Sequence, residues 1–161
     1  MNAQSARVDG LELNLYQPFS FLPEPFNGFG VDVNLTRINS QVIIPTRPGA
    51  DLPFFRQPGK IANLTLFYEK GKFQGRVALT YSDSQLYTLG SAPLSDIYRI
   101  GRRQYDLQLR YRLTNHLSVT GSVRNLSAEP EQFEYGPAHS YLMRTSRQLG
   151  RDYKLGFSMN Y

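Results

Sequence analysis

The stretch "YDLQLRYRL" (residues 105–113) alternates strictly between apolar and polar residues. One set is aromatic or aliphatic and the other is charged or carries an amide: Tyr105, Leu107, Leu109, Tyr111 and Leu113 against Asp106, Gln108, Arg110 and Arg112. Successive side chains of a β-strand point to opposite faces, so this pattern predicts a strand with one apolar and one polar face. The polar face must be in contact with water, because an unhydrated charge is costly.

The same alternation recurs in six further stretches. They are residues 10–17, 29–37, 61–69, 73–82, 117–125 and 153–161. The chain is rich in Tyr, Phe, Gly and Pro, which suits strands and turns, and lacks the long Ala/Glu/Lys/Leu runs of helices. We therefore predict an all-β fold in which residues 1–161 form a single unit, an antiparallel up-and-down meander of about seven strands.

The connections between these strands alternate in length. Short connections of about 3 residues (70–72 and 114–116) and a Pro- and Gly-rich turn of about 11 (18–28) alternate with connections of about 20, 20 and 25 residues (40–59, 83–102 and 127–151). Short connections thus fall at one edge of the sheet and long ones at the other. This asymmetry is typical of outer-membrane barrels, which have tight periplasmic turns and long external loops.

The predicted polar faces carry nearly all the strand charges: Glu12, Asp32, Glu69, Arg76, Asp106, Arg110, Arg112, Arg124 and Lys154. The opposite faces carry almost none, and aromatic residues recur near the strand ends, where membrane interfaces are expected: Tyr68, Phe73, Tyr81, Tyr105, Tyr111 and Tyr161. Alternation by itself describes a soluble sandwich or a lipocalin-like ligand-binding barrel equally well. The connection lengths and the aromatic C-terminus favour the membrane barrel.

Composition argues against several other functions. There is no Cys, and His116 and His139 lie in separate predicted turns or loops, so we expect no metal site and no cofactor. The net charge of +5 is scattered and fits no nucleic-acid-binding motif, so we expect no nucleic-acid partner. The sequence has no run of about 18 apolar residues, so it predicts no transmembrane helix. The opening "MNAQSARVDG" lacks the pattern of a signal peptide.

Four segments, in order, resemble the C-terminal barrel region of TonB-dependent outer-membrane receptors. They are "VDGLELNLYQPFSFLPEPFNGFGVDVNLT" (8–36), "PGKIANLTLFYEKGKFQGRVALTYS" (58–82), "LTNHLSVTGSVRNLSAEP" (113–130) and the aromatic C-terminal end. The resemblance implies a bacterial outer-membrane transporter with a barrel of 22 strands, of which this chain would be the C-terminal third. It implies an import function for a siderophore, carbohydrate or similar nutrient.

The ending "YKLGFSMNY" (153–161) resembles the signal that closes outer-membrane barrels. The matching residues are Lys154, Gly156, Met159 and Tyr161, although an aromatic is commoner at the position of Met159. The resemblance implies that the barrel-assembly machinery reads this strand by edge pairing, a form of β-augmentation.

The resemblance also implies partners outside the chain. Family members have a signal peptide, a TonB-binding segment and a plug domain, which we expect to lie in sequence not included here. Outer-membrane lipid would surround the barrel. The strands near residues 10 and 157 would each leave an unpaired edge, so we expect the isolated chain to be an open curved sheet.

Aromatic and basic residues of the predicted loops are the candidates for ligand contact, because rings stack on sugars and Arg pairs with anions: Tyr87, Tyr98, Arg99, Arg102, Phe133, Tyr135 and Tyr141. The alternative is that most of these side chains only pack the loops against one another. The polar row Asp106, Arg110, Arg112 and Arg124 could bind the plug or line a hydrated path, but we favour the interpretation that it is a self-compensating charge ladder across neighbouring strands. No catalytic residues are expected. A Ser–His hydrolase is a weak alternative, because Ser118 and His116 occupy turn and strand positions that do not form a nucleophile–base pair.

Overall fold

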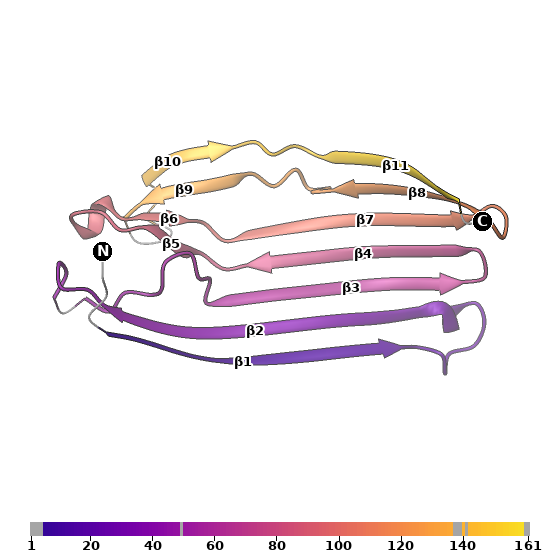
Figure 1. The fold of residues 1–161 in the computed structure, drawn as a ribbon, viewed down its shortest axis with the longest axis horizontal. Helices are drawn as coiled ribbons and strands as arrows, with labels where there is room; N and C mark the ends of the chain where they lie inside the picture. The colour runs from indigo at the N-terminus through magenta and orange to yellow at the C-terminus, as the bar shows by residue number, and fades with distance from the viewer. Residues whose placement is uncertain (1–4, 49, 137–139, 141, 160–161) are drawn as a thin grey trace.

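Seven strands form one antiparallel sheet in the computed structural model, which describes residues 5–48, 50–136, 140 and 142–159. Its order is β1 (Ser5–Pro18), β2 (Phe29–Ile43), β3 (Lys60–Lys70), β4 (Phe73–Ser82), β7 (Arg102–Arg112), β8 (Leu117–Arg124) and β11 (Asp152–Met159). Each strand pairs with its neighbour along this order (Figure 1). The predicted all-β, up-and-down meander is confirmed, and we call it the large sheet.

The short connections lie together at one end of the large sheet and the long ones at the other (Figure 1). The β3–β4 turn is tight and uses Gly71 at a positive φ of 59°. The β1–β2 turn contains the short 3-10 helix η1 (Phe26–Gly28), and a second one, η2 (Pro93–Ser95), lies in a long connection. No helix within the described residues is long and apolar enough to cross a membrane.

Two of the long connections are not simple loops. They contain β5 (Gln85–Thr88), β6 (Ile97–Arg99), β9 (Glu131–Tyr135) and β10 (Leu142–Arg147), which form a second sheet in the order β10-β9-β6-β5. This small sheet continues the large sheet beyond its long-connection end, with β9 beyond β8 and β10 beyond β11 (Figure 1). The sequence pattern predicts long connections without strands here, so these four short strands are a difference from the prediction.

The strand register aligns the apolar residues of all seven strands on one face. Leu66 lies between Val31 and Val77, and Leu107 lies between Val77 and Val123. The ten residues of β4 at roughly 3.3 Å each reach roughly 33 Å along the strand. At the ~40° tilt typical of membrane barrels this gives a band about 25 Å tall, the height of their lipid-facing surface.

An aromatic row closes this apolar face at the short-turn end. The rings of Phe29 and Tyr68 meet edge to face at 4.7 Å between centroids, and Tyr68 lies 6.0 Å from Phe73. Phe73 is directly opposite Tyr111 in the register. Such a row across neighbouring strands is the arrangement that membrane barrels place at the lipid–water interface.

At the long-connection end the apolar face changes to charged residues. Arg37 and Lys60 face each other on β2 and β3, and Arg103 lies opposite Tyr81. β1 begins at Ser5, earlier than predicted, and its first residues continue this row with Arg7 and Asp9. The strands therefore extend beyond the apolar band into a region where this face is polar.

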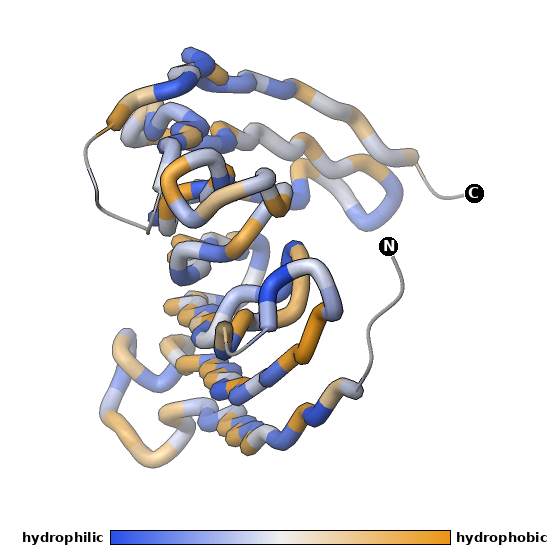
Figure 2. The backbone as a smooth tube through the Cα atoms, turned by 90° about the vertical axis from the view of Figure 1, so that its left-hand side faces the viewer, coloured by the Kyte–Doolittle hydropathy of each residue, from blue (hydrophilic) through white to orange (hydrophobic). Residues whose placement is uncertain are grey.

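The large sheet is an open arc when viewed along its strands (Figure 2). Among the described residues, β1 pairs with β2 alone and β11 with β8 alone, so each strand has one unpaired edge. Their apolar side chains are also uncovered, with Leu11 75% and Leu155 71% exposed. The predicted open curved sheet is therefore confirmed.

The buried core lies at the long-connection end rather than under the large sheet. Its centre is Val42, Ile44, Leu52 and Leu86. Val42 follows Ser40 on the polar face of β2, where the Ser40 hydroxyl accepts a 3.0 Å hydrogen bond from the Phe54 backbone N–H. Residues 44–48 and 50–59 therefore fold back over the polar face of the sheet.

Candidate functional site

The small sheet, the described residues of its connections, and residues 44–48 and 50–59 form one packed unit, which we call the loop cap. Leu86 of β5 is fully buried at its centre, between the outer end of β2 and residues 44–59. The Leu86 carbonyl also accepts a 2.7 Å hydrogen bond from the Arg56 backbone N–H. Two segments far apart in the sequence are thus joined by apolar packing and by a backbone bond.

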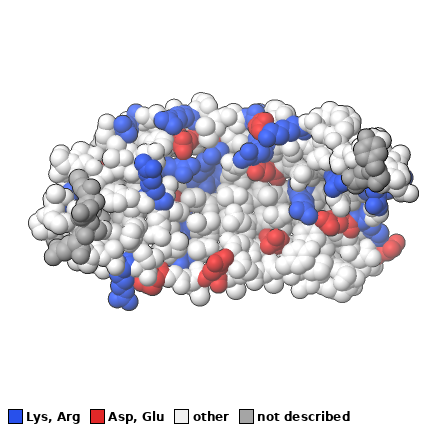
Figure 3. Space-filling model, in the orientation of Figure 1, with Lys and Arg blue, Asp and Glu red and all other residues white. Residues whose placement is uncertain are grey.

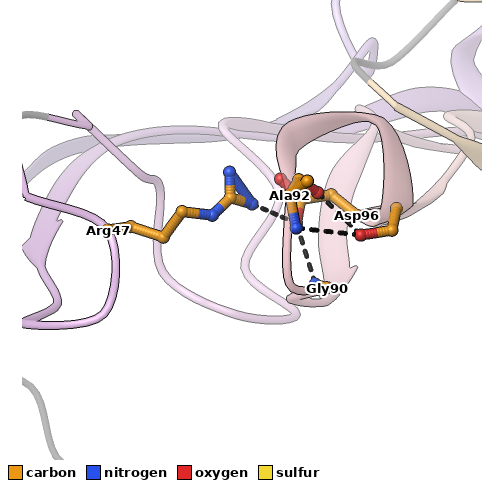
Figure 4. A network of polar contacts seen from close by, with 5 residues as sticks. Arg47, Gly90, Ala92 and Asp96 are labelled. Carbon is orange, nitrogen blue, oxygen red and sulfur yellow. Dashed lines mark hydrogen bonds and ion pairs between the residues drawn. The ribbon is translucent and has the colours of Figure 1, made fainter.

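A buried ion pair fastens the loop cap. Arg47 Nη2 lies 2.5 Å from Asp96 Oδ1, and the two side chains are 10% and 5% exposed. The same Asp96 oxygen accepts a 2.8 Å bond from the Gly90 backbone N–H (Figure 4). The Asp96 carbonyl accepts a 2.9 Å bond from the N–H of Gly136, at the end of β9. Asp96 therefore connects all three long connections.

The turn that holds Asp96 in place is itself hydrogen-bonded. Ser95 Oγ donates to the Ala92 carbonyl at 2.8 Å and accepts from the Ala92 N–H at 3.0 Å. The Asp96 N–H donates to the Pro93 carbonyl at 3.3 Å. Alternation analysis of the sequence did not identify Arg47 or Asp96, because they lie in connections and are 49 residues apart.

Tyr87 and Phe133, two of the predicted ligand-contact residues, pack against each other. Their rings meet edge to face at 5.0 Å between centroids. The guanidinium of Arg56 lies 4.5 Å from the centre of the Tyr87 ring, and that of Arg147 lies 5.7 Å from the Phe133 ring. Phe133 is buried. These contacts join β5 and β9 to residues 44–59.

Tyr98 and Arg99 lie next to each other on β6, on opposite faces of the small sheet. Burial raises the pKa of the Tyr98 hydroxyl, the Asp96 carboxylate raises it further, and the Arg47 guanidinium lowers it. Arg99 Nε lies 3.0 Å from Glu131 Oε1, and Glu131 is also 3.8 Å from Arg147. Arg99 therefore has a carboxylate partner within the cap.

Tyr135 is the most open of the predicted residues on the small sheet. It is 40% exposed, and Arg144 of β10 lies 5.7 Å from its ring centre. Arg102 lies at the start of β7, and its buried Nε has no hydrogen-bond partner among the residues that the structure describes. Tyr141 lies outside the described residues. The structure thus brings five of the seven predicted residues onto one sheet: Tyr87, Tyr98, Arg99, Phe133 and Tyr135.

A polar hollow of about 310 Å³ lies at the base of the cap, between β2, residues 53–59 and β5. Gln57, Asp83, Gln85 and Tyr98 contribute to its lining, which contains no Lys or Arg. Gln85 is 7% exposed. The side-chain carbonyl oxygens of Gln57 and Gln85 are buried and have no hydrogen-bond partner in the described part of the chain. The hollow offers hydrogen-bonding groups and one carboxylate, which suits neutral, hydroxyl-bearing solutes better than anions.

The polar face of the large sheet carries charge along its middle (Figure 3). The predicted ladder of Asp106, Arg110, Arg112 and Arg124 is wrong, since no ion pair joins these four described residues. Asp106 accepts from the Asn125 N–H at 2.9 Å, Arg110 donates to Ser118 Oγ at 3.0 Å and Arg112 donates to the Gly71 carbonyl at 3.0 Å. Asp106, Arg110 and Arg112 lie on the same strand, β7, and each of them bonds to a group nearer than the other charged residues of the row.

The predicted barrel-closing strand is β11. Lys154 lies opposite Ser122, Gly156 opposite Thr120 and Met159 opposite Leu117, all on β8. Lys154 is exposed and lies 3.3 Å from Asp152. Tyr161 lies outside the described residues. The strand presents its second edge without a partner in the described chain.

No catalytic or metal-binding arrangement is evident within the described ranges. No group of three or more His, Cys, Asp or Glu residues there could hold a metal ion. Ser118, the hydroxyl considered for a hydrolase, is buried and accepts the hydrogen bond from Arg110. That contact does not favour a role as a nucleophile, which needs an adjacent base.

Comparisons with known proteins agree with this geometry. A family model described as TonB dependent receptor-like, beta-barrel, matches residues 1–126. No curated protein sequence matches the chain. Among solved structures, the chain is similar to the siderophore receptor PiuA from Acinetobacter baumannii, with a TM-score of 0.66 and 18% identity. The match covers 97% of this chain and 22% of that receptor, so the chain spans about a fifth of the receptor's length.

Proposed function

Because the chain belongs to the TonB-dependent receptor-like β-barrel family, we propose that residues 1–161 are one unit of an outer-membrane transporter, its C-terminal barrel strands. The main observation in support of this proposal is the register of the large sheet, which aligns an uncharged, exposed band on one face and charged residues on the other. Lipid would cover the apolar band, and the polar face would line a hydrated lumen. The cell location would be the bacterial outer membrane.

The unpaired edges of β1 and β11 support the proposal that further strands of the same barrel lie outside this chain. An open edge in a membrane leaves backbone groups without hydrogen bonds, so the barrel must close. The family implies a plug domain inside the lumen and TonB acting through it. The barrel-assembly machinery would pair with the free edge of β11, which carries Lys154, Gly156 and Met159.

The loop cap would bind a small-molecule nutrient, of siderophore, carbohydrate or similar type. Tyr135 is the leading contact because its ring is exposed, whereas Phe133 and Arg99 already have partners in the cap. Tyr135→Ala is expected to weaken ligand binding by roughly tenfold, the scale of one lost aromatic contact. Tyr135→Phe, which keeps the ring, should bind nearly normally. Equal binding by both variants and the parent would contradict the role of Tyr135.

A soluble lipocalin-like barrel is less well supported. Such a protein would need its apolar face turned inward around a closed cavity. Here the apolar face includes Leu13, Leu66 and Leu109, which are 57%, 46% and 43% exposed. An uncovered apolar surface of this extent requires lipid or another partner.

Cysteine labelling of intact cells tests the proposed orientation. The 161 residues contain no Cys, so once any Cys elsewhere in the intact protein has been replaced, each single replacement reports one position. In the intact protein that carries this chain, Ser91→Cys in the loop cap should react with a membrane-impermeant maleimide, and Lys72→Cys in the β3–β4 turn should react after cell lysis. Both positions are exposed. Labelling of Lys72→Cys in intact cells, with Ser91→Cys protected, would overturn the orientation.

A further inference from the structure

A groove of about 350 Å³ lies on the apolar face of the large sheet, at the end nearest the loop cap. Its walls are largely aliphatic and aromatic, with Leu13, Leu35, Ala62 and Tyr81 from four neighbouring strands. Arg37 and Lys60 line the same groove. A surface that combines an apolar channel with two cations at its end has the chemistry of an anionic amphiphile site.

The two cations lie in an unusual arrangement. Arg37 of β2 and Lys60 of β3 are directly opposite in the register, and like charges in that position destabilise a strand pair. Both are exposed, and neither has an ion-pair partner in the described chain. Other cations in this row do have contacts, since Arg7 lies 3.7 Å from Asp9 and Arg103 lies 6.0 Å from the Tyr81 ring. An anion between Arg37 and Lys60 would relieve their repulsion.

We propose that this groove binds a phosphate-bearing lipid of the outer leaflet, with an acyl chain along Leu13, Leu35 and Ala62 and the phosphate between Arg37 and Lys60. This inference rests on the proposed placement of the large sheet in the outer membrane. Arginine binds phosphate oxygens in a bidentate fork, and lysine adds a point charge. The groove lies where the apolar band meets the charged row, which is the depth of a lipid headgroup.

Native mass spectrometry of the detergent-purified intact protein tests the site. The probe is a short-chain phosphatidic acid, compared with the matching phosphatidylcholine and with inorganic phosphate. Phosphatidic acid should bind more tightly than either comparison probe, because it combines an acyl chain with a net negative phosphate. Removing both cations in Arg37→Gln/Lys60→Gln should weaken its binding roughly 30-fold, which corresponds to about 2 kcal/mol at 1.4 kcal/mol per tenfold.

Two further variants separate the charge from the groove. Ala62→Trp should fill the groove and weaken phosphatidic acid binding while both cations remain. Arg110→Gln/Arg124→Gln removes the same charge from the polar face and should bind like the parent. The lipid site would be overturned if phosphatidylcholine or inorganic phosphate bound as tightly as phosphatidic acid. It would also be overturned if the polar-face control lost as much phosphatidic acid binding as Arg37→Gln/Lys60→Gln. A protein absent from the outer-membrane fraction would overturn the transporter proposal as well.

Discussion

Arg47 and Asp96 form a buried ion pair with 2.5 Å between Nη2 and Oδ1, and they belong to different connections of the large sheet. Because the Asp96 carboxylate also accepts a bond from the Gly90 N–H and the Asp96 backbone carbonyl accepts one from the Gly136 N–H, three long connections are joined at this one residue. Nearby, Val42, Ile44, Leu52 and Leu86 form the apolar core. The connections are therefore held as one unit.

Asp96→Asn should loosen the loop cap while leaving the large sheet folded. The substitution removes the charge that compensates the buried Arg47 guanidinium, and breaking a buried pair typically costs about 3 kcal/mol or more. We expect hydrogen exchange of the β5 and β6 amides to accelerate about 100-fold, with β3 and β4 unchanged. Lys154→Gln is the control, because it breaks an exposed pair worth less than about 1 kcal/mol.

Replacing both partners tests whether the charge itself is needed. In Arg47→Met/Asp96→Leu no charge is left uncompensated, so the cap should be more stable than in Asp96→Asn. It should not regain full protection, because the Gly90 N–H loses its acceptor, at a cost of about 1–3 kcal/mol. Equal protection in Asp96→Asn and Lys154→Gln would show that the ion pair does not hold the cap.

The stability of the loop cap should depend on alkaline pH through Tyr98. Burial and the Asp96 carboxylate raise the pKa of this phenol above its ordinary value of 10.0, whereas the Arg47 guanidinium lowers it. The folded cap thus binds the proton more tightly than the unfolded chain. The stability that the protonated Tyr98 hydroxyl contributes is complete below about pH 10 and is lost as the pH rises through the raised pKa.

Tryptophan fluorescence can follow this loss, since the chain contains no Trp. A Leu94→Trp reporter, at a position 70% exposed in the cap, should show weaker resistance to urea as the pH increases from about 9 to 11. With Tyr98→Phe added, that part of the pH dependence should disappear. If resistance to urea falls equally with pH in the proteins with and without the Tyr98 hydroxyl, Tyr98 is excluded as the source of the pH dependence.

The large sheet could be predicted from the sequence because each strand inside the apolar band has one wet and one apolar face. Alternation such as that of residues 105–113 is a direct consequence. β1 was predicted to begin at residue 10, since Arg7 and Asp9 interrupt the apolar row where the strand leaves the band. The closing strand was placed within two residues of β11.

The loop cap could not be predicted in the same way. β5 and β6 have four and three residues, too few to show a period, and their pairing is irregular between Leu86 and Thr88. The predicted aromatic and basic residues were chosen by type and position in loops. Their contacts, such as Tyr87 with Phe133, join residues distant in the sequence and depend on the folded arrangement.

Gly30 should be intolerant of a side chain. A Cβ there would lie 2.1 Å from the Phe67 ring, which is buried and stacked on Tyr16 at 5.4 Å. Gly30→Ala must displace both rings, and overpacking of this kind costs about 1–3 kcal/mol. Gly121→Ala is the control because no atom lies within 4 Å of its Cβ position. The urea midpoint in detergent should fall for Gly30→Ala alone, and equal midpoints would contradict the packing.

A single arginine on each face of β4 tests which face meets lipid. Val77 lies in the middle of the apolar band between Leu66 and Leu107, whereas Thr80 lies on the polar face between Asn63 and Gln104. Val77→Arg should destabilise insertion by about 2–4 kcal/mol, the cost of Arg at the bilayer midplane, and Thr80→Arg should remain close to the parent. Folding into lipid vesicles, measured by urea titration, gives both values. A larger loss for Thr80→Arg than for Val77→Arg would reverse the assignment of the faces, and with it the placement of the lumen.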